Sequence, residues 1–290
     1  MPSLRRFGYW YLLGALALAA VFIWSAVFWI EAHRGRLYLH VLDVGQGDAL
    51  LIEAPNGSQV LIDGGPDTSV LARLGEIMPF WDRSLDLIVL THPHADHLDG
   101  LLTVLQHYTV GAVIESGVNH TIPEYAVWES EIKRRGIGRI AARRGQVVGL
   151  SGGASLSLLA PFRPFDGVSV RNVHEASVVM RLEFAGSTAL LMADAEAPLE
   201  RELLAAGGGL RADVLKVGHH GSKTSTSQAF LDRVQPRLAA ISAGRQNRYG
   251  HPAQEVLDRL HAAGIAVFRT DGQGTVTFVS GGRGFAVRAR

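Results

Sequence analysis

The sequence THPHADHLDG, which begins at Thr91, constrains this chain more than any other segment, because it holds three histidines and two aspartates in ten residues. The apolar run 85–90 before it has the length and composition of a buried strand. The ligand-type side chains, in an H-x-H-x-D-H spacing, are His92, His94, Asp96 and His97. Alternate residues of an extended strand exit share a face, so the first two histidines can bind one metal ion. The aspartate and the third histidine would start the next helix and face a second ion.

Composition limits the chemistry of such a site. The 290 residues include 12 histidines and no cysteine, which excludes disulfides, thiolate zinc sites and a cysteine nucleophile. Histidine nitrogen and carboxylate oxygen remain as ligands, and both suit zinc and manganese. The net charge of +1 argues against nucleic-acid binding by bulk charge alone.

The N-terminal segment 1–36 is predicted to be a membrane anchor. No charged residue occurs over the 24 residues 7–30, and a helix of that length spans a hydrocarbon core of about 30 Å. Aromatic residues gather at both ends, as in an interfacial belt: Phe7, Tyr9, Trp10, Tyr11, Trp24, Phe28 and Trp29. The segment Ala17-Leu18-Ala19 resembles a signal-peptide cleavage site, but the apolar run continues beyond a usual h-region of about 7–15 residues.

The orientation of this anchor follows from the flanking positive charges. Arg5 and Arg6 precede the helix, and Arg34 and Arg36 follow it, so the count of Lys and Arg is equal. The terminal amine tips the balance towards an N-terminus inside the cell. The chain is therefore expected in the cell membrane with a single pass and an extracytoplasmic catalytic domain.

Residues 37–290 are predicted to form one α/β domain, with no linker-like stretch. Alternating and apolar runs predict strands at 37–44, 49–54, 59–63, 85–90, 155–159, 177–184, 188–192, 213–217, 238–242, 266–269 and 275–279. Helical spacing is found at 69–78, 98–107, 124–135, 197–205, 228–234 and 253–263. The early connections are too short for a doubly wound sheet, so two mixed sheets with helices outside fit better.

The H-x-H-x-D-H segment resembles the metallo-β-lactamase superfamily, and the resemblance spans 37–290. It implies an αββα sandwich with a dinuclear site for two divalent ions. Asp63, in LIDGG, would hold a metal-binding histidine by hydrogen bonding. Asp194 would be the bridging carboxylate, and His174, 20 residues before it, a further ligand. The last ligand would come from the pair His219-His220, with the first of the two favoured.

Three further motifs resemble the ComEC-like competence or DNA-internalisation type. They are LDVGQGDA at 42–49, KVGHHGSKTS at 216–225 and NRYGHP at 247–252. That type usually has Asn where His174 stands, so this histidine restores a ligand of the wider superfamily. The type also has a multi-helix membrane channel before this domain. With one helix, the chain resembles a stand-alone anchored version or a truncated piece.

The resemblance implies a reaction and a set of residues for it. A metal-bound hydroxide would attack a phosphoryl or carbonyl group, with Asp96 and Asp194 accepting protons. Either His220 or His251 would donate a proton to the leaving oxygen. Residues expected to bind the substrate phosphate are Lys216, Ser222, Lys223, Thr224, Ser225 and Asn247.

Three functions follow from this reading. The first is a membrane-anchored phosphodiesterase, in particular a nuclease working in DNA uptake with single-stranded DNA and a separate channel protein as partners. Residues 151–290 carry 16 basic and 12 acidic side chains, which suits an anionic substrate. The second is hydrolysis of another bond on the same fold, such as a lactone, thioester, β-lactam or phosphorylcholine ester. The third is a non-catalytic DNA-binding or assembly subunit.

Overall fold

The computed structural model describes residues 3–288, which form two compact units separated near Gly35. The side chains of residues 3–7, 26, 29, 30, 32 and 33 are outside this description. The predicted roles of Arg5 and Arg6 in orientation, and of Phe7 and Trp29 in the interfacial belt, therefore fall on side chains that are not described. Residues 289 and 290, the last two of the expected 37–290 domain, also lie outside the described residues.

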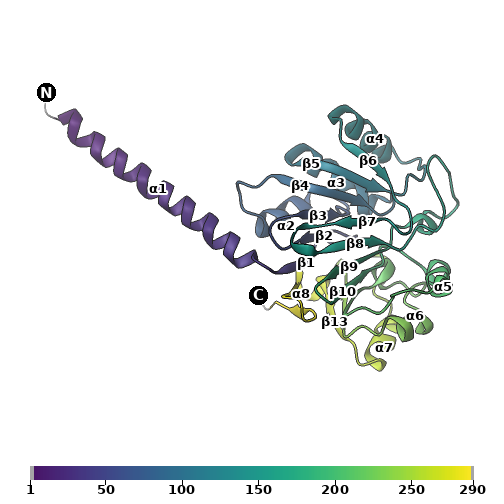
Figure 1. Cartoon of the computed structure of the whole chain (residues 1–290). Coiled ribbons are helices and arrows are strands. Elements are labelled where there is room, and N and C mark those ends of the chain that lie inside the picture. The colour runs from purple at the N-terminus through teal and green to yellow at the C-terminus, as the bar shows by residue number, and fades with distance from the viewer. Residues whose placement is uncertain (1–2, 289–290) are drawn as a thin grey trace. The chain divides into compact units, whose positions relative to one another are not determined.

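The first unit is the helix α1 (Ser3–His33), drawn in purple in Figure 1. Its stretch Gly8–Ser25 is long and apolar enough to cross a membrane, judged by length and composition. A signal sequence near an N-terminus meets the same criterion. The described side chains of this stretch are exposed.

The second unit contains two mixed β-sheets. The eight-stranded sheet has the order β15-β14-β1-β2-β3-β4-β5-β6. Its strands are β1 (Leu37–Val41), β2 (Leu50–Glu53), β3 (Gln59–Ile62), β4 (Ser84–Leu90), β5 (Thr109–Glu115), β6 (Gly138–Ala141), β14 (Val276–Ser280) and β15 (Ala286–Val287). The neighbours from β3 to β6 are parallel and the others antiparallel.

The seven-stranded sheet has the order β13-β12-β11-β10-β9-β8-β7. Its strands are β7 (Val147–Gly149), β8 (Ser155–Leu158), β9 (Met180–Phe184), β10 (Ser187–Leu191), β11 (Val214–Lys216), β12 (Leu238–Ile241) and β13 (Ala266–Arg269). The neighbours from β10 to β13 are parallel, and those from β7 to β10 are antiparallel.

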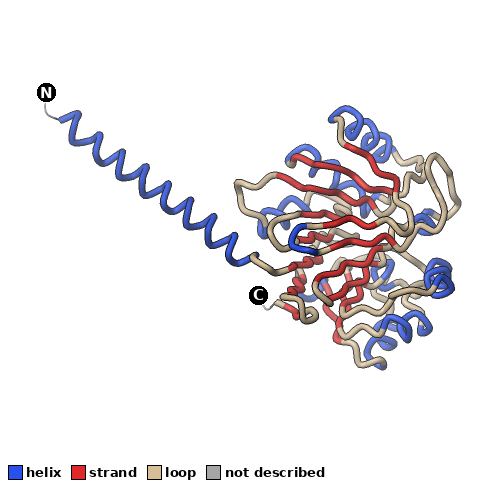
Figure 2. The backbone as a smooth tube through the Cα atoms, viewed as in Figure 1, coloured by secondary structure: helices blue, strands red, loops and turns tan. Residues whose placement is uncertain are grey.

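Helices cover the outer face of each sheet, while the inner faces pack on one another (Figure 2). The helices of this unit are α2 (Ser69–Ile77), α3 (Ala95–His107), α4 (Pro123–Arg135), α5 (Ala197–Ala206), α6 (Gln228–Val234), α7 (Gln254–Ala262) and the short α8 (Thr270–Gln273). The first three pack on the eight-stranded sheet, and α5, α6 and α7 pack on the other.

The alternation of side chains along each strand produces these layers. In β4, Leu87 and Val89 join the core between the sheets, whereas Ile88 and Leu90 join the core under the helices. Because successive side chains of a strand point to opposite faces, an apolar strand can serve both cores. The predicted fold class, a sandwich of two mixed sheets flanked by helices, is confirmed.

Some predicted elements differ from the structure. The expected strand 177–184 begins only at Met180. Before it, the Val178 N–H donates to the Thr91 carbonyl, and the Val179 carbonyl accepts from Leu159 and Ala160, so these residues bond to loops instead of a neighbouring strand. The strands β5, β6 and β7 were not among the expected elements. In β5, a Cβ on Gly111 would lie 2.6 Å from the Asp86 carbonyl oxygen, so the close contact between β5 and β4 needs glycine. Glycine has low strand propensity, and the sequence pattern therefore did not indicate this strand.

Candidate metal centre

The candidate site is assembled from loops that follow strand ends. The segment beginning at His92 follows β4, Asp194 follows β10, and His220 follows β11. His174 lies in the 3₁₀ turn before β9. β10 and β11 are parallel neighbours, so their carboxyl ends meet at one edge of the seven-stranded sheet. β9 is antiparallel to β10, so its start lies at that edge too, and β4 brings its loop from the other sheet of the sandwich.

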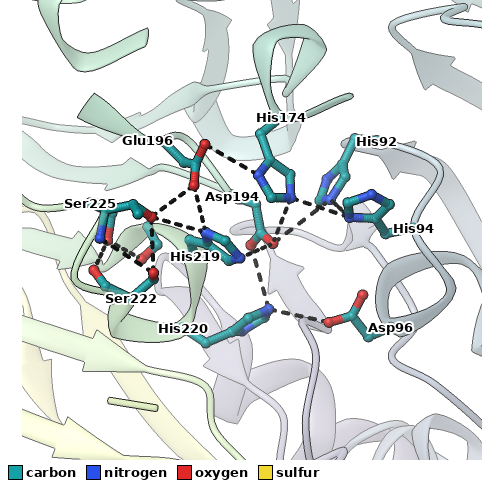
Figure 3. A network of polar contacts seen from close by, with 12 residues as sticks. His92, His94, Asp96, His174, Asp194, Glu196, His219, His220, Ser222 and Ser225 are labelled. Atoms are coloured by element: carbon teal, nitrogen blue, oxygen red, sulfur yellow. Dashed lines mark hydrogen bonds and ion pairs between the residues drawn. The ribbon is translucent and has the colours of Figure 1, made fainter. Parts of the chain in front are cut away.

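Asp194 lies at the centre of this cluster and is 1 % exposed (Figure 3). Its Oδ2 is 3.4 Å from Nε2 of His97 and 3.8 Å from Nε2 of both His92 and His174. Its Oδ1 is 3.5 Å from Nε2 of His220. These separations exceed those of good hydrogen bonds. They are short enough for both atoms to bind one ion, since zinc–ligand distances are about 2.0–2.2 Å.

Among the described residues the potential ligands form four groups, each with its ligand atoms within 4.8 Å of one another. Two of them are His174, Glu196 and His219, and Asp48, His97 and Asp194. The remaining two share no residue. One group is His92, His94, His174 and Asp194. The other is Asp96, His97 and His220. Asp194 faces this second group as well, so its carboxylate lies between the two. The predicted residues of the H-x-H-x-D-H segment are thus divided two and two.

Several buried atoms at this centre have no hydrogen-bond partner among the described residues. They are Nε2 of His97, Oδ1 of Asp194 and both ring nitrogens of His220. An unsatisfied buried polar atom is costly, and divalent ions bound by His97 Nε2, Asp194 Oδ1 and one ring nitrogen of His220 would satisfy these three atoms. The donor set therefore fits metal ions.

Asp63 lies beneath the second group and is fully buried. Its Oδ2 accepts a hydrogen bond from His97 Nδ1 at 2.8 Å, and its carboxylate also accepts from the backbone N–H and hydroxyl of Thr91. This fixes the His97 ring with Nε2 turned towards Asp194. A histidine ligand held in this way keeps the tautomer that metal binding needs.

The histidines differ in their affinity for protons. Burial lowers the pKa of His92 well below its usual value and that of His94 to about 4. Burial also disfavours protonation of His220, but Asp194 and Asp48 raise its pKa to about 10. Asp194 and Asp63 likewise raise the pKa of His97 despite its burial. Without metal, protons on these last two rings balance the carboxylates, so metal binding would displace them.

His220, rather than the favoured His219, lies with Asp96 and His97. Both residues of the pair have positive φ, 48° and 53°, so the turn directs their rings to different places. The ring of His219 has Nδ1 3.3 Å from Glu196 and Nε2 3.7 Å from Asp194 Oδ2. Glu196 also lies 3.5 Å from Nδ1 of His174. The sequence offered no signal for Glu196 beyond its position two residues after Asp194.

Lys216 does not face the opening, contrary to the expectation that it binds substrate. Its side chain is 1 % exposed and its Nζ donates to Asp48 Oδ2 at 2.8 Å. Burial would raise the pKa of Asp48, but the charges of Lys216 and His220 hold it below its usual range. The motif LDVGQGDA contains Asp48, although no role was assigned to it.

The other expected phosphate-binding residues are divided between the surface and the interior. Lys223 and Thr224 are exposed. Ser225 is buried, and its hydroxyl donates to the Gly218 carbonyl at 2.7 Å, so it stabilises the turn instead of facing substrate. Ser222 is buried as well, 2.9 Å from the Thr224 hydroxyl. The amide of Asn247 bonds to the backbone of Gly244 and His251, which assigns it to loop structure.

A cavity of about 270 Å³ opens above the cluster. Its lining residues are Gln46, His94, Ala95, Asp96, His174, Asp194, His219, His220, Tyr249 and His251. His251 lies on this wall with its ring 5.7 Å from that of His219. Gln46 and Tyr249 were not among the expected site residues, although each belongs to a quoted motif.

The sequence pattern of the metallo-beta-lactamase superfamily matches residues 42–245. The chain belongs to the metallo-beta-lactamase superfamily. Its αββα sandwich and its cluster of histidines and aspartates are features of the metal-dependent hydrolase fold of this superfamily.

Curated relatives confirm the resemblance to competence proteins. The chain is 35% identical over 256 residues to ComE operon protein 3 of Bacillus subtilis, covering 82% of this chain and 32% of that protein. It is 34% identical to Recombination protein 2 of Haemophilus influenzae, covering 81% and 28%. Competence protein ComA of Neisseria gonorrhoeae is 32% identical, covering 82% and 31%. The chain thus spans about a third of the length of these relatives.

Solved structures share the fold at low sequence identity. CmlA, a diiron beta-hydroxylase from Streptomyces venezuelae, aligns with a TM-score of 0.54 and 16% identity, covering 83% of this chain and 53% of CmlA. Zn²⁺-bound PqqB from Methylobacterium extorquens gives 0.51 and 13%, covering 82% and 99%. These likenesses show the metallo-beta-lactamase fold alone.

Proposed function

We propose that the chain is a membrane-anchored, metal-dependent phosphodiesterase that cleaves single-stranded DNA. The observation that carries this proposal is the pair of ligand groups sharing Asp194 at the base of an open cavity. The similarity to competence proteins supports a substrate in DNA uptake. A separate membrane channel protein would then deliver the strand.

Two divalent ions, zinc or manganese, would occupy the centre. His92, His94 and His174 would hold one ion, while Asp96, His97 and His220 would hold the other, with Asp194 between them. Bound there, the ions would activate water and polarise a phosphoryl oxygen. All these ligands are nitrogen or oxygen donors, which suits either metal.

The protein's own side chains would handle protons and charge. Burial opposes ionisation of Asp96, but His97 and His220 lower its pKa, so its carboxylate is ionised and can accept a hydrogen bond from water. His220 has both ring nitrogens directed at carboxylates. This leaves His251, on the cavity wall, to meet the leaving oxygen. Lys223 and Arg248 are exposed and lie close in the chain to the cavity residues His220 and Tyr249. Their positive charges would attract a phosphate backbone.

The proposal predicts DNA cleavage by the full-length chain purified in detergent. After chelation, reloading with Mn²⁺ or Zn²⁺ should restore cleavage of end-labelled single-stranded DNA. His94→Ala should lower the rate by about 100-fold or more, because loss of a direct ligand exceeds the 10–100-fold cost of an outer-shell change. His107→Ala is the matched control, since this exposed histidine lies at the other end of α3.

A substrate panel separates the competing functions. Hydrolysis of a lactone, thioester or β-lactam without DNA cleavage would replace the phosphodiesterase with another hydrolase. A chain that binds DNA but neither binds metal nor cleaves it would favour a non-catalytic subunit.

A further inference from the structure

A buried ion pair lies behind the second ligand group. Asp48 and Lys216 are each 1 % exposed, and Nζ is 2.8 Å from both carboxylate oxygens. They are 168 residues apart in the chain and come from two of the motifs noted above. A buried ion pair is weak evidence for stability, because desolvation offsets its attraction. A role in the site explains the pair better.

The ring of His220 lies between this pair and the ligand group. Its Nδ1 is 3.4 Å from Asp48 Oδ1. Its Nε2, on the opposite side, is 3.5 Å from both Asp96 Oδ2 and Asp194 Oδ1. A metal-binding histidine commonly donates its second ring N–H to a carboxylate, which fixes the ring.

The backbone around Asp48 is fixed to the same loops. Its N–H donates to the carbonyl of Asp96, and its carbonyl accepts from the N–H of Gly65. At Gly47, with φ of +132°, a Cβ would lie 2.1 Å from the Asp96 carbonyl oxygen, so only glycine allows this approach. The loop that carries Asp48 is thus held in contact with the backbone of Asp96, a residue of the second group.

We propose that the Asp48–Lys216 pair positions His220 for the second metal ion. Lys216, which also donates to the Val217 carbonyl at 3.1 Å, holds the carboxylate in place. With the ion bound, the carboxylate would accept the Nδ1–H of His220, from which it is separated by 3.4 Å, and would keep Nε2 turned towards the ion. Asp63 acts in the same way on His97, so each histidine of the second group has its own buried carboxylate. The inference rests on the metal centre of the proposed function, not on its substrate.

The test replaces the pair without leaving a buried charge. The double variant Asp48→Leu with Lys216→Met removes the acceptor but keeps the volume, and such replacements are commonly tolerated. The double variant Asp48→Asn with Lys216→Met keeps an acceptor oxygen. The metal-free full chain would be titrated with Co²⁺ in detergent and followed by visible absorption, with thermal unfolding as the check on folding.

The leucine variant should bind the second ion about 10–100-fold more weakly while its first ion is unchanged. The asparagine variant should retain affinity within a few-fold of wild type. Glu115→Gln is a control for buried ion pairs in general, because Glu115 pairs with Arg139 away from the centre. It should leave both ions bound as in wild type.

Two results would overturn the positioning role. One is wild-type affinity for the second ion in the leucine variant. The other is equal weakening in the asparagine variant, which would assign the effect to charge alone. If the leucine variant does not fold, Asp48→Ala with Lys216→Met replaces it, with the same expectations. If the variants change the affinity for the second ion as expected but the wild-type chain cleaves no DNA, the positioning role holds and the proposed phosphodiesterase function is excluded.

Discussion

Asp194 is the side chain on which the centre depends most, because its carboxylate faces both ligand groups. Oδ2 faces His92 and His174 of one group and His97 of the other, whereas Oδ1 faces His220. The nearby positive rings hold its pKa well below the usual value, although burial alone would raise it. The carboxylate is therefore ionised and ready to bind two cations over the physiological pH range.

The adjacent residues His219 and His220 provide the sharpest residue-scale prediction. His220→Ala should abolish binding of the second ion, with an affinity loss of about 100-fold or more, because it removes a direct ligand. His219→Ala should retain the second ion, because its ring forms a separate group with His174 and Glu196 and does not lie with Asp96 and His97. Equilibrium dialysis followed by elemental analysis measures both. Loss of the second ion in His219→Ala alone would contradict the assignment.

The sequence could not choose between these two histidines. Both follow β11 and both are ligand-type residues. The choice depends on the turn, where two successive positive φ values send the rings apart. The sequence did identify His92, His94, Asp96 and His97, because their spacing after a buried strand is local. Asp194 and His174 were expected from the resemblance to the superfamily. Burial of Lys216 was missed because its partner Asp48 is remote in the chain.

At the scale of elements, the loop after β3 packs against the first turns of α3. Gly64 donates its N–H to the His97 carbonyl, and Gly100 donates to the Gly65 carbonyl. A Cβ on Gly100 would lie 1.9 Å from the Gly64 carbonyl oxygen. This close approach places Asp63 beneath the His97 ring, so the contact between a loop and a helix sets the geometry of a ligand.

Gly100→Ala should therefore destabilise the domain although alanine favours helices. The propensity gain is about 1 kcal/mol, whereas overpacking typically costs about 1–3 kcal/mol, and the backbone oxygen in its way cannot rotate aside. Because the contact is with backbone, the cost should lie in the upper part of this range, about 2–3 kcal/mol, which leaves a net loss of about 1–2 kcal/mol, measured by urea unfolding of the metal-free chain.

The control for this change is Gly138→Ala. Gly138 lies in β6 with nothing within 4 Å of an added Cβ. Its effect should be small or stabilising. Equal destabilisation by both substitutions would mean that the loss of glycine, not the contact with Gly64, matters.

Elements were predictable where apolar periodicity is strong. The predicted limits of α6 and β13 agree with the structure, and those of α2 and α7 differ only by a residue at their ends. Strand β7 was missed because its three residues are too few to show a period. Strand β6 was missed because its residues are exposed or half-buried. Tertiary pairing with β8 and β5, respectively, stabilises them.

At the scale of the whole molecule, the absence of cysteine gives a direct test of topology. We expect Ser130→Cys, at an exposed position of α4, to react with a membrane-impermeant maleimide in intact cells. Ser3→Cys, before the apolar stretch, should react only after permeabilisation. The reason is the terminal amine, which tips an otherwise equal count of flanking positive charges towards an N-terminus inside the cell.

The wild-type chain is the blank in this experiment, because it has no thiol of its own. The opposite labelling pattern would place residues 36–288 in the cytoplasm. Labelling of Ser130→Cys in the soluble fraction would show that the apolar helix is removed as a signal sequence.

The sequence by itself determined the chemistry available to this protein: histidine and carboxylate ligands, no thiols, and a helix apolar enough to span a membrane. These properties are local, because they depend on residue type and on short spacing. The tertiary structure alone decided which histidine joins Asp96 and His97, and that Lys216 is buried against Asp48. Those outcomes depend on contacts between loops from different strands, and no local pattern encodes which side chains such loops bring together.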